Sequence, residues 1–271
     1  MSDHADRVTI TIEAGVADVR MVRTDKMNAL DEAMFEALVT AGERLKSEKG
    51  VRAAVLSGEG RAFCAGIDTG NLKRRAENGG GTLLSHGFAP RTHGLANRSQ
   101  YAAWVWREVP VPVIAAVHGV AFGGGLQIAL GCDMRFVTPD ARLSVMELKW
   151  GLVPDMSGTQ TLVGLAREDV IRDLVYTARI VSGEEALALG LATRVCADPR
   201  AEALAAAREI AGKNPHAIRA AKRLINEAAL AGPAKGLLAE SVEEDALAGS
   251  PNQVEAVKAN FENRPPAFID P

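Results

Sequence analysis

The sequence lacks the cysteine and histidine patterns of disulfide-stabilised or metal-binding proteins. Its three cysteines, Cys64, Cys132 and Cys196, are dispersed and form no CxxC pair, which predicts reduced thiols and a cytoplasmic protein. The five histidines show no HExxH or other ligand spacing, so we expect no metal site. A chain of 271 residues can bury a sufficient core without such cross-links.

The sequence also lacks a strong positive charge and long apolar runs. Its net charge is −3 and its pI is near 6.0, which gives no electrostatic footprint for nucleic acid. No stretch approaches the about 18 uncharged apolar residues of a membrane span, and residues 1–7 lack the apolar run of a signal peptide. We therefore expect neither a nucleic-acid partner nor a membrane association.

What is present is the composition of one globular domain, 47% hydrophobic and 24% charged. In the first half, apolar alternation or short β-branched runs predict strands at 8–12, 16–22, 51–56, 113–117 and 134–137. Between them, a helix should follow the capping residue Asp31 as far as residue 50, and another should span 126–130. This strand–helix–strand order predicts an α/β fold with a partly parallel sheet.

From residue 157 onward the pattern becomes helical. Alanine- and leucine-rich segments, and one final amphipathic stretch, predict helices at 183–191, 200–212, 215–230, 236–247 and 254–261. The segment 72–100 differs from the rest, because it has little periodicity and contains basic and triple-glycine clusters. It is either a functional lid over a site or a surface insertion without a role.

Two glycine-containing turns could present backbone N–H groups to a ligand. Residues 61–68 leave a predicted strand, and Gly66 permits a turn that a larger residue would resist, although an ordinary strand-to-loop turn would look the same. Residues 116–125 end in three glycines that open a helix, and a helix N-terminus stabilises an anionic oxygen. The glycines match neither nucleotide-binding pattern, GxGxxG or GxxxxGK[ST].

Two carboxylates, Glu147 and Asp155, lie in apolar surroundings. Burial there would raise their pKa values, and a carboxylate so placed can move a carbon-bound proton. Alternatively, Glu147 is a surface residue and Asp155 caps the helix that begins near Ser157.

Together and in this order, these stretches resemble the crotonase (enoyl-CoA hydratase/isomerase) superfamily, over a region from Asn28 to Phe261. The resemblance implies a spiral of ββα units with a C-terminal helical trimerisation region. We accordingly divide the chain into a core at 1–195 and a helical region at 196–271. It also implies a homotrimer or a hexamer built as a dimer of trimers.

The resemblance further implies an acyl-CoA substrate, with coenzyme A entering as part of that substrate and no tightly bound cofactor. The N–H groups of Ile67 and Gly124 would form an oxyanion hole for the thioester enolate. Asp68 would shape the loop, and Phe261 and Arg264 would approach the coenzyme A of a neighbouring subunit. Positions implied to bind substrate are Lys26, Ala29, Cys64, Ala65, Gly66, Asp68, Gly123, Gln127, Phe261 and Arg264.

The sequence departs from the family at Gln127. Hydratases of the family have a glutamate there, and a glutamine cannot act as a base, although it could orient a water or the thioester. Glu147 with Asp155, eight residues apart, resembles the dienoyl-CoA isomerases instead. We therefore favour a double-bond isomerase. The alternatives are a hydratase with one main carboxylate, an acyl-CoA-binding protein with little turnover and, third in rank among enzymes, an aryl-CoA dehalogenase.

Overall fold

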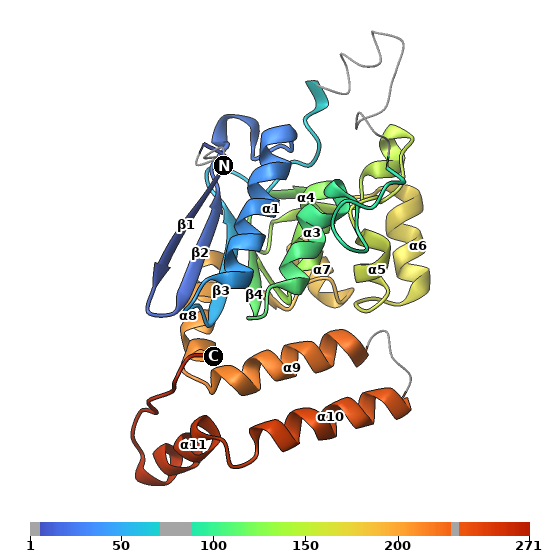
Figure 1. Ribbon diagram of the computed structural model, residues 1–271. Helices are drawn as coiled ribbons and strands as arrows, with labels where there is room; N and C mark the ends of the chain where they lie inside the picture. Colours follow the sequence, from blue (N-terminus) through green and yellow to red (C-terminus); the bar gives the residue numbers. More distant parts are fainter. Residues whose placement is uncertain (1–5, 71–87, 229–232) are drawn as a thin grey trace.

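The computed structural model describes residues 6–70, 88–228 and 233–271 (Figure 1). Its larger sheet has the strand order β1-β2-β3-β4-β6-β9 and its smaller sheet the order β5-β7-β8. The strands are β1 (Val8–Glu13), β2 (Val16–Met21), β3 (Ala53–Gly58), β4 (Val113–Val117), β5 (Val120–Phe122), β6 (Met134–Val137), β7 (Arg142–Ser144), β8 (Val181–Ser182) and β9 (Arg194–Val195).

The helices within the described residues include two short 3-10 turns, η1 and η2. Their bounds are η1 (Thr24–Lys26), α1 (Glu32–Ser47), α3 (Arg98–Glu108), α4 (Gly124–Gly131), η2 (Glu147–Trp150), α5 (Gly158–Leu162), α6 (Glu168–Thr177), α7 (Gly183–Ala188), α8 (Pro199–Ala211), α9 (Pro215–Ala228), α10 (Pro233–Leu247) and α11 (Pro251–Glu262).

The predicted α/β class with a partly parallel sheet is confirmed. The hairpin β1–β2 is antiparallel, whereas β2–β3, β3–β4, β4–β6 and β6–β9 are parallel pairs. The predicted helix cap is also confirmed, because the Asp31 side chain accepts a hydrogen bond from the Met34 N–H at 2.9 Å. The helix it caps, α1, ends at Ser47 rather than at residue 50.

Helices cover both faces of the larger sheet, and the alternation along β3 shows why. Ala54 and Leu56 join the core formed with α1, α3 and α4, whereas Ala53 and Val55 face a second core that includes three alanines of α8. Because successive side chains of a strand point to opposite faces, a strand covered on both faces is mostly apolar. All six residues of β3 are buried.

Several elements were not predicted from the sequence. Strands β8 and β9 interrupt the region that we expected to be purely helical, and β9 joins the larger sheet beside β6. Helices α3 and α6 were missed, and α3 begins inside the segment 72–100, at a capping box formed by Asn97 and Gln100. Residues 72–87 of that segment lie outside the described residues, and so does the choice between a lid and a surface insertion without a role.

Helices α9, α10 and α11 lie together at one end of the molecule (Figure 1). Lys222 of α9 is buried and anchors this region to the core by donating to the carbonyl oxygens of Trp106 and Val111 and to the Asp133 carboxylate. In contrast, α8 packs on one face of the larger sheet, against β3 and β4. The division at residue 195 and the trimerisation role of the C-terminal region remain predictions.

Candidate active site

A cavity of about 920 Å³ lies where four segments of the chain meet, and its volume is typical of small-molecule sites. These segments are 25–32, 65–70, 122–124 and 146–156, and Phe35, Phe88 and Ser99 complete the lining. Ten of the predicted site residues line it: Lys26, Ala29, Ala65, Gly66, Ile67, Asp68, Gly123, Gly124, Glu147 and Asp155. Residues far apart in the sequence are thus brought to one place.

The backbone N–H of Ile67 has no hydrogen-bond partner among the described residues. Ile67 forms a parallel bridge with Leu30, in which the Leu30 N–H donates to Gly66 O at 2.8 Å and the Asp68 N–H donates to Leu30 O at 3.0 Å. In such a bridge the flanking residues bond to the partner, so the N–H of Ile67 itself points away from Leu30. It is free to donate to a ligand.

The second free donor lies at the start of α4. Gly124 is the first residue of this helix, so its N–H has no intrahelical partner. The preceding residue, Gly123, has φ +51°, a left-handed conformation that favours glycine. Gly66 has φ +82°, and a Cβ there would lie 2.5 Å from Phe122 O and 3.8 Å from the Gly124 N. This close approach brings the Ile67 and Gly124 donors to the same part of the cavity.

Glu147 is a buried carboxylate beside these donors, with 7% of its surface exposed. Its Oε1 accepts a hydrogen bond from Gln127 Nε2 at 2.6 Å, and Oε1 would lie 3.1 Å from a Cβ at Gly123. Burial raises the pKa of Glu147, and the nearby charge of Asp155 adds to the rise. A raised pKa suits a carboxyl group that both accepts and returns a proton during a reaction.

Asp155 lines the same cavity, and burial raises the pKa of its carboxyl group too. The alternative interpretation, that Asp155 caps the following helix, is wrong, because the N-cap position of α5 is Ser157 and no side chain caps it by a hydrogen bond. Asp155 is thus left with its carboxyl group at the cavity rather than at a helix end.

Two predicted substrate-binding residues do not line the cavity. Cys64 is fully buried, its thiol donates to Asn28 O, and its backbone N–H and C=O both bond to β5. Gln127 is 1% exposed and both ends of its amide are occupied by protein groups. The predicted contacts of Cys64 and Gln127 with substrate are corrected accordingly, because neither has a free polar group at the cavity.

Phe261 and Arg264 are also absent from the cavity of their own chain. The Phe261 side chain is 85% exposed on α11, and Arg264 forms ion pairs with Glu255 and Glu262, each at 2.6 Å. The approach of these two residues to a neighbouring subunit's coenzyme A remains a prediction. Lys26, in contrast, is exposed on η1 and lines the cavity.

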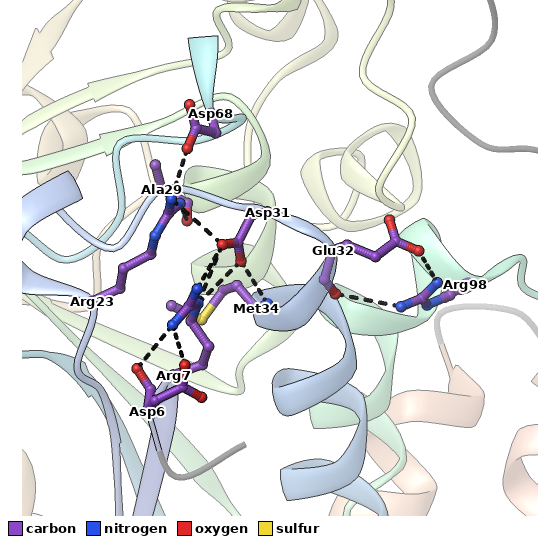
Figure 2. Close-up of polar contacts among 9 residues, drawn as sticks. All are labelled: Asp6, Arg7, Arg23, Ala29, Asp31, Glu32, Met34, Asp68 and Arg98. Carbon is purple, nitrogen blue, oxygen red and sulfur yellow. Dashed lines mark hydrogen bonds and ion pairs between the residues drawn. The ribbon is translucent and has the colours of Figure 1, made fainter. Parts of the chain in front are cut away.

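Arg23, which no sequence pattern indicated, joins two of the segments that line the cavity (Figure 2). Its guanidinium donates to Ala29 O at 2.8 Å and to the Asp68 carboxylate at 2.8 Å, and lies 3.4 Å from the Asp31 carboxylate. Arg7 supports the arrangement by binding Asp31 at 2.9 Å. The two segments that pair through Leu30 and Ile67 are therefore also joined by side chains. This contact agrees with a loop-shaping role for Asp68.

The described residues contain no candidate metal site and no candidate membrane-spanning helix. No group of three or more His, Cys, Asp or Glu side chains there could hold a metal ion. Among the helices described, none has the length and apolar character needed to cross a membrane.

Known proteins match this chain over nearly its whole length. The family model for enoyl-CoA hydratase/isomerase matches residues 11–271. Mitochondrial methylglutaconyl-CoA hydratase of Mus musculus is 31% identical over 261 residues, covering 94% of this chain and 79% of that protein. The mitochondrial Delta(3,5)-Delta(2,4)-dienoyl-CoA isomerase of Mus musculus is 31% identical over 228 residues, covering 82% and 69%.

A solved structure extends the match to three dimensions. The crystal structure of an enoyl-CoA hydratase from Polaromonas sp. JS666 superposes with a TM-score of 0.85 at 25% identity, covering 97% of this chain and 100% of that one. The predicted crotonase-type fold is thereby confirmed.

Proposed function

This chain belongs to the enoyl-CoA hydratase/isomerase family, and from that premise we propose that it is an acyl-CoA double-bond isomerase. The substrate would be a 3-enoyl- or 3,5-dienoyl-CoA, with coenzyme A as part of the substrate and no other cofactor. The single observation that carries the choice of isomerisation is the amide at position 127, which leaves Glu147 and Asp155 as the two cavity-lining carboxyl groups whose pKa values burial raises.

The free N–H groups of Ile67 and Gly124 would stabilise the enolate. Removal of a proton from C2 of the thioester places negative charge on the carbonyl oxygen, and two fixed donors would bind that oxygen more tightly as its charge grows. Because both donors belong to the backbone, they need no reorganisation during the reaction. Loss of one such donor typically lowers the rate by about 10²–10³.

Glu147 would remove the C2 proton, and Asp155 would return a proton at C4, or at C6 of a 3,5-diene. The double bond moves, no atom is gained or lost, and the carboxyl pair holds one proton before and after the step. The raised pKa of each carboxyl group supports this exchange, because one member can carry the proton while the other is ionised.

The second candidate is a hydratase in which Glu147 serves both steps of water addition. The similarity to methylglutaconyl-CoA hydratase favours it. It would require Glu147 alone to activate water and to handle the C2 proton, because the Gln127 amide cannot act as a base. An acyl-CoA-binding protein with little turnover would show neither reaction.

The test is to mix the purified protein separately with 3-enoyl-, 3,5-dienoyl- and 2-enoyl-CoA and follow ultraviolet absorbance. We expect isomerisation of the first or second substrate and little hydration of the third. The Glu147→Gln variant should lower the isomerisation rate by about 10²–10⁴. Glu13→Gln is the matched control, because Glu13 is exposed on β1, away from the cavity lining. Activity on 2-enoyl-CoA alone would favour the hydratase, and no turnover of any substrate would favour the binding protein.

A further inference from the structure

The Gln127 side chain is held at both ends by hydrogen bonds. Its Oε1 accepts from the backbone N–H groups of Met156 at 2.9 Å and Gly158 at 2.8 Å, and its Nε2 donates to Glu147 Oε1 at 2.6 Å. Only the oxygen of an amide can accept from two N–H groups, so the amide nitrogen must face Glu147. The orientation of the amide is therefore set by its surroundings.

This contact makes the two oxygens of Glu147 different. Oε1 is an acceptor from Gln127, so a proton on the carboxyl group belongs on Oε2. Oε2 is buried and has no hydrogen-bond partner among the described residues. A buried polar atom without a partner is costly, and such atoms are retained where a ligand or a reaction uses them.

We propose that Gln127 is a positioning residue that fixes the Glu147 carboxylate with Oε2 free for the substrate, and that couples this carboxylate to the backbone next to Asp155. The inference rests on the proposed role of Glu147 as the base. It assigns proton transfer to one atom, Oε2, and gives the amide at position 127 a part in the reaction although it does not contact the substrate.

The packing around the amide supports this role. A Cβ at Gly158 would lie 2.5 Å from Gln127 Oε1, so only a glycine lets the backbone approach the amide this closely. The same turn carries Ser157 in a left-handed conformation, with φ +67°. A strained turn is maintained where the surrounding contacts hold it, and Gln127 supplies two of those contacts.

The Gln127→Glu variant keeps the hydrogen bonds at one end of the side chain and removes the hydrogen bond at the other end. Its carboxylate can still accept from Met156 and Gly158, but an oxygen replaces the nitrogen that donated to Glu147. Because two carboxylates then face each other, we expect the pKa of Glu147 to rise. At neutral pH kcat should fall roughly tenfold with KM nearly unchanged, and the acid limb of the kcat–pH profile should move to higher pH.

A second measurement needs no substrate. The carboxyl ¹³C resonance of Glu147 is followed as a function of pH in labelled protein, and it is assigned by its absence from the spectrum of Glu147→Gln. Gln127→Met, which removes the donor without adding charge, should also raise the pKa of Glu147. Gln160→Glu, at an exposed glutamine of α5, is the matched control and should leave it unchanged.

An unchanged titration and pH profile in either folded Gln127 variant would overturn the positioning role. If the wild type does not isomerise any substrate but both variants shift the Glu147 titration, the positioning role stands and the proposed function fails. If the wild type isomerises and the titration does not move, only the positioning role fails.

Discussion

At the scale of single residues, the site depends on Glu147, a carboxylate that is buried within the protein. Burial disfavours the ionised form of Glu147, whereas hydrogen bonds from its own backbone N–H and from Gln127 favour it, and burial is the larger effect. The negative charge of Asp155 acts in the same direction as burial. A base of this kind binds a proton more readily than an exposed glutamate does.

The causes of the raised Glu147 pKa predict how the pH dependence of the Asp155→Asn variant should change. A base works in its ionised form, so kcat/KM should fall as the pH drops through the raised pKa of Glu147. Removing the Asp155 charge removes one cause of that rise, so the acid limb should move to lower pH. If Asp155 also returns the proton, kcat should fall by about 10²-fold. The measurement is the pH dependence of kcat and kcat/KM with an enoyl-CoA substrate.

Asp140→Asn is the matched control for this variant, because Asp140 is exposed and does not line the cavity. If Asp155→Asn had the same kcat and the same acid limb of the pH profile as Asp140→Asn, Asp155 would have no part in proton transfer. Glu147 would then carry the proton alone.

The sequence identified the two carboxylates but not how Gln127 acts. An apolar neighbourhood around Glu147 is visible in the sequence, because adjacent residues show it. The pairing of Gln127 with Met156 and Gly158 is not visible, because it joins positions about 30 residues apart through the fold. The interpretation of Gln127 as a ligand for water or the thioester failed for that reason.

At the scale of elements, the cavity depends on two chain segments held side by side. The backbone pairs them through Leu30 and Ile67, and Arg23 joins the same segments through Ala29 and Asp68. An arginine that donates to a carbonyl and a carboxylate at once fixes both more firmly than a single contact would. The position of the Ile67 N–H therefore depends on a side chain outside the cavity lining.

We expect Arg23→Met to lower kcat/KM by about 10- to 100-fold, less than the full loss of an oxyanion-hole donor. The substitution removes the link between the two segments and leaves the Asp31 and Asp68 charges facing each other without the cation between them. Arg44→Met, at an exposed arginine of α1 that pairs with Glu48, is the control. If kcat/KM of the Arg23 variant lay within twofold of this control, the backbone pairing of Leu30 with Ile67 alone would be enough to position the Ile67 N–H.

The main elements could be predicted because their sequence patterns are long enough to have a period. The six-residue strand β3 is buried throughout and begins with four apolar residues, and α1 buries Met34, Leu38 and Leu45 at helical spacing. Strands β8 and β9 have two residues each, too few to show any alternation. Their place in the sheets is decided by neighbouring strands, which the local sequence does not contain.

At the scale of the whole molecule, the C-terminal helices expose apolar side chains. These are Ile225, Leu237, Leu238, Val242 and Phe261, each at least 60% exposed. Apolar residues gathered on one region commonly mark an interface between subunits. We therefore predict a homotrimer or a hexamer, with a mass by light scattering of three or six times 28.6 kDa. A mass of 28.6 kDa that does not change with protein concentration would contradict this prediction.

At the same scale, we propose that this molecule moves a double bond and does not add water. The most direct measurement combines ultraviolet absorbance with mass spectrometry of the thioester after the wild-type protein has acted in ¹⁸O-enriched water on a 3-enoyl- or 3,5-dienoyl-CoA and, separately, on a 2-enoyl-CoA. An isomerase changes the absorbance of the 3-enoyl or 3,5-dienoyl substrate, and the product keeps the mass of the substrate without ¹⁸O, apart from any exchanged hydrogen. A hydratase leaves these substrates unchanged and converts 2-enoyl-CoA to a product heavier by one water, with ¹⁸O at the new hydroxyl group. We predict the first result, and an ¹⁸O-labelled product from 2-enoyl-CoA with no change in the other substrates would contradict it.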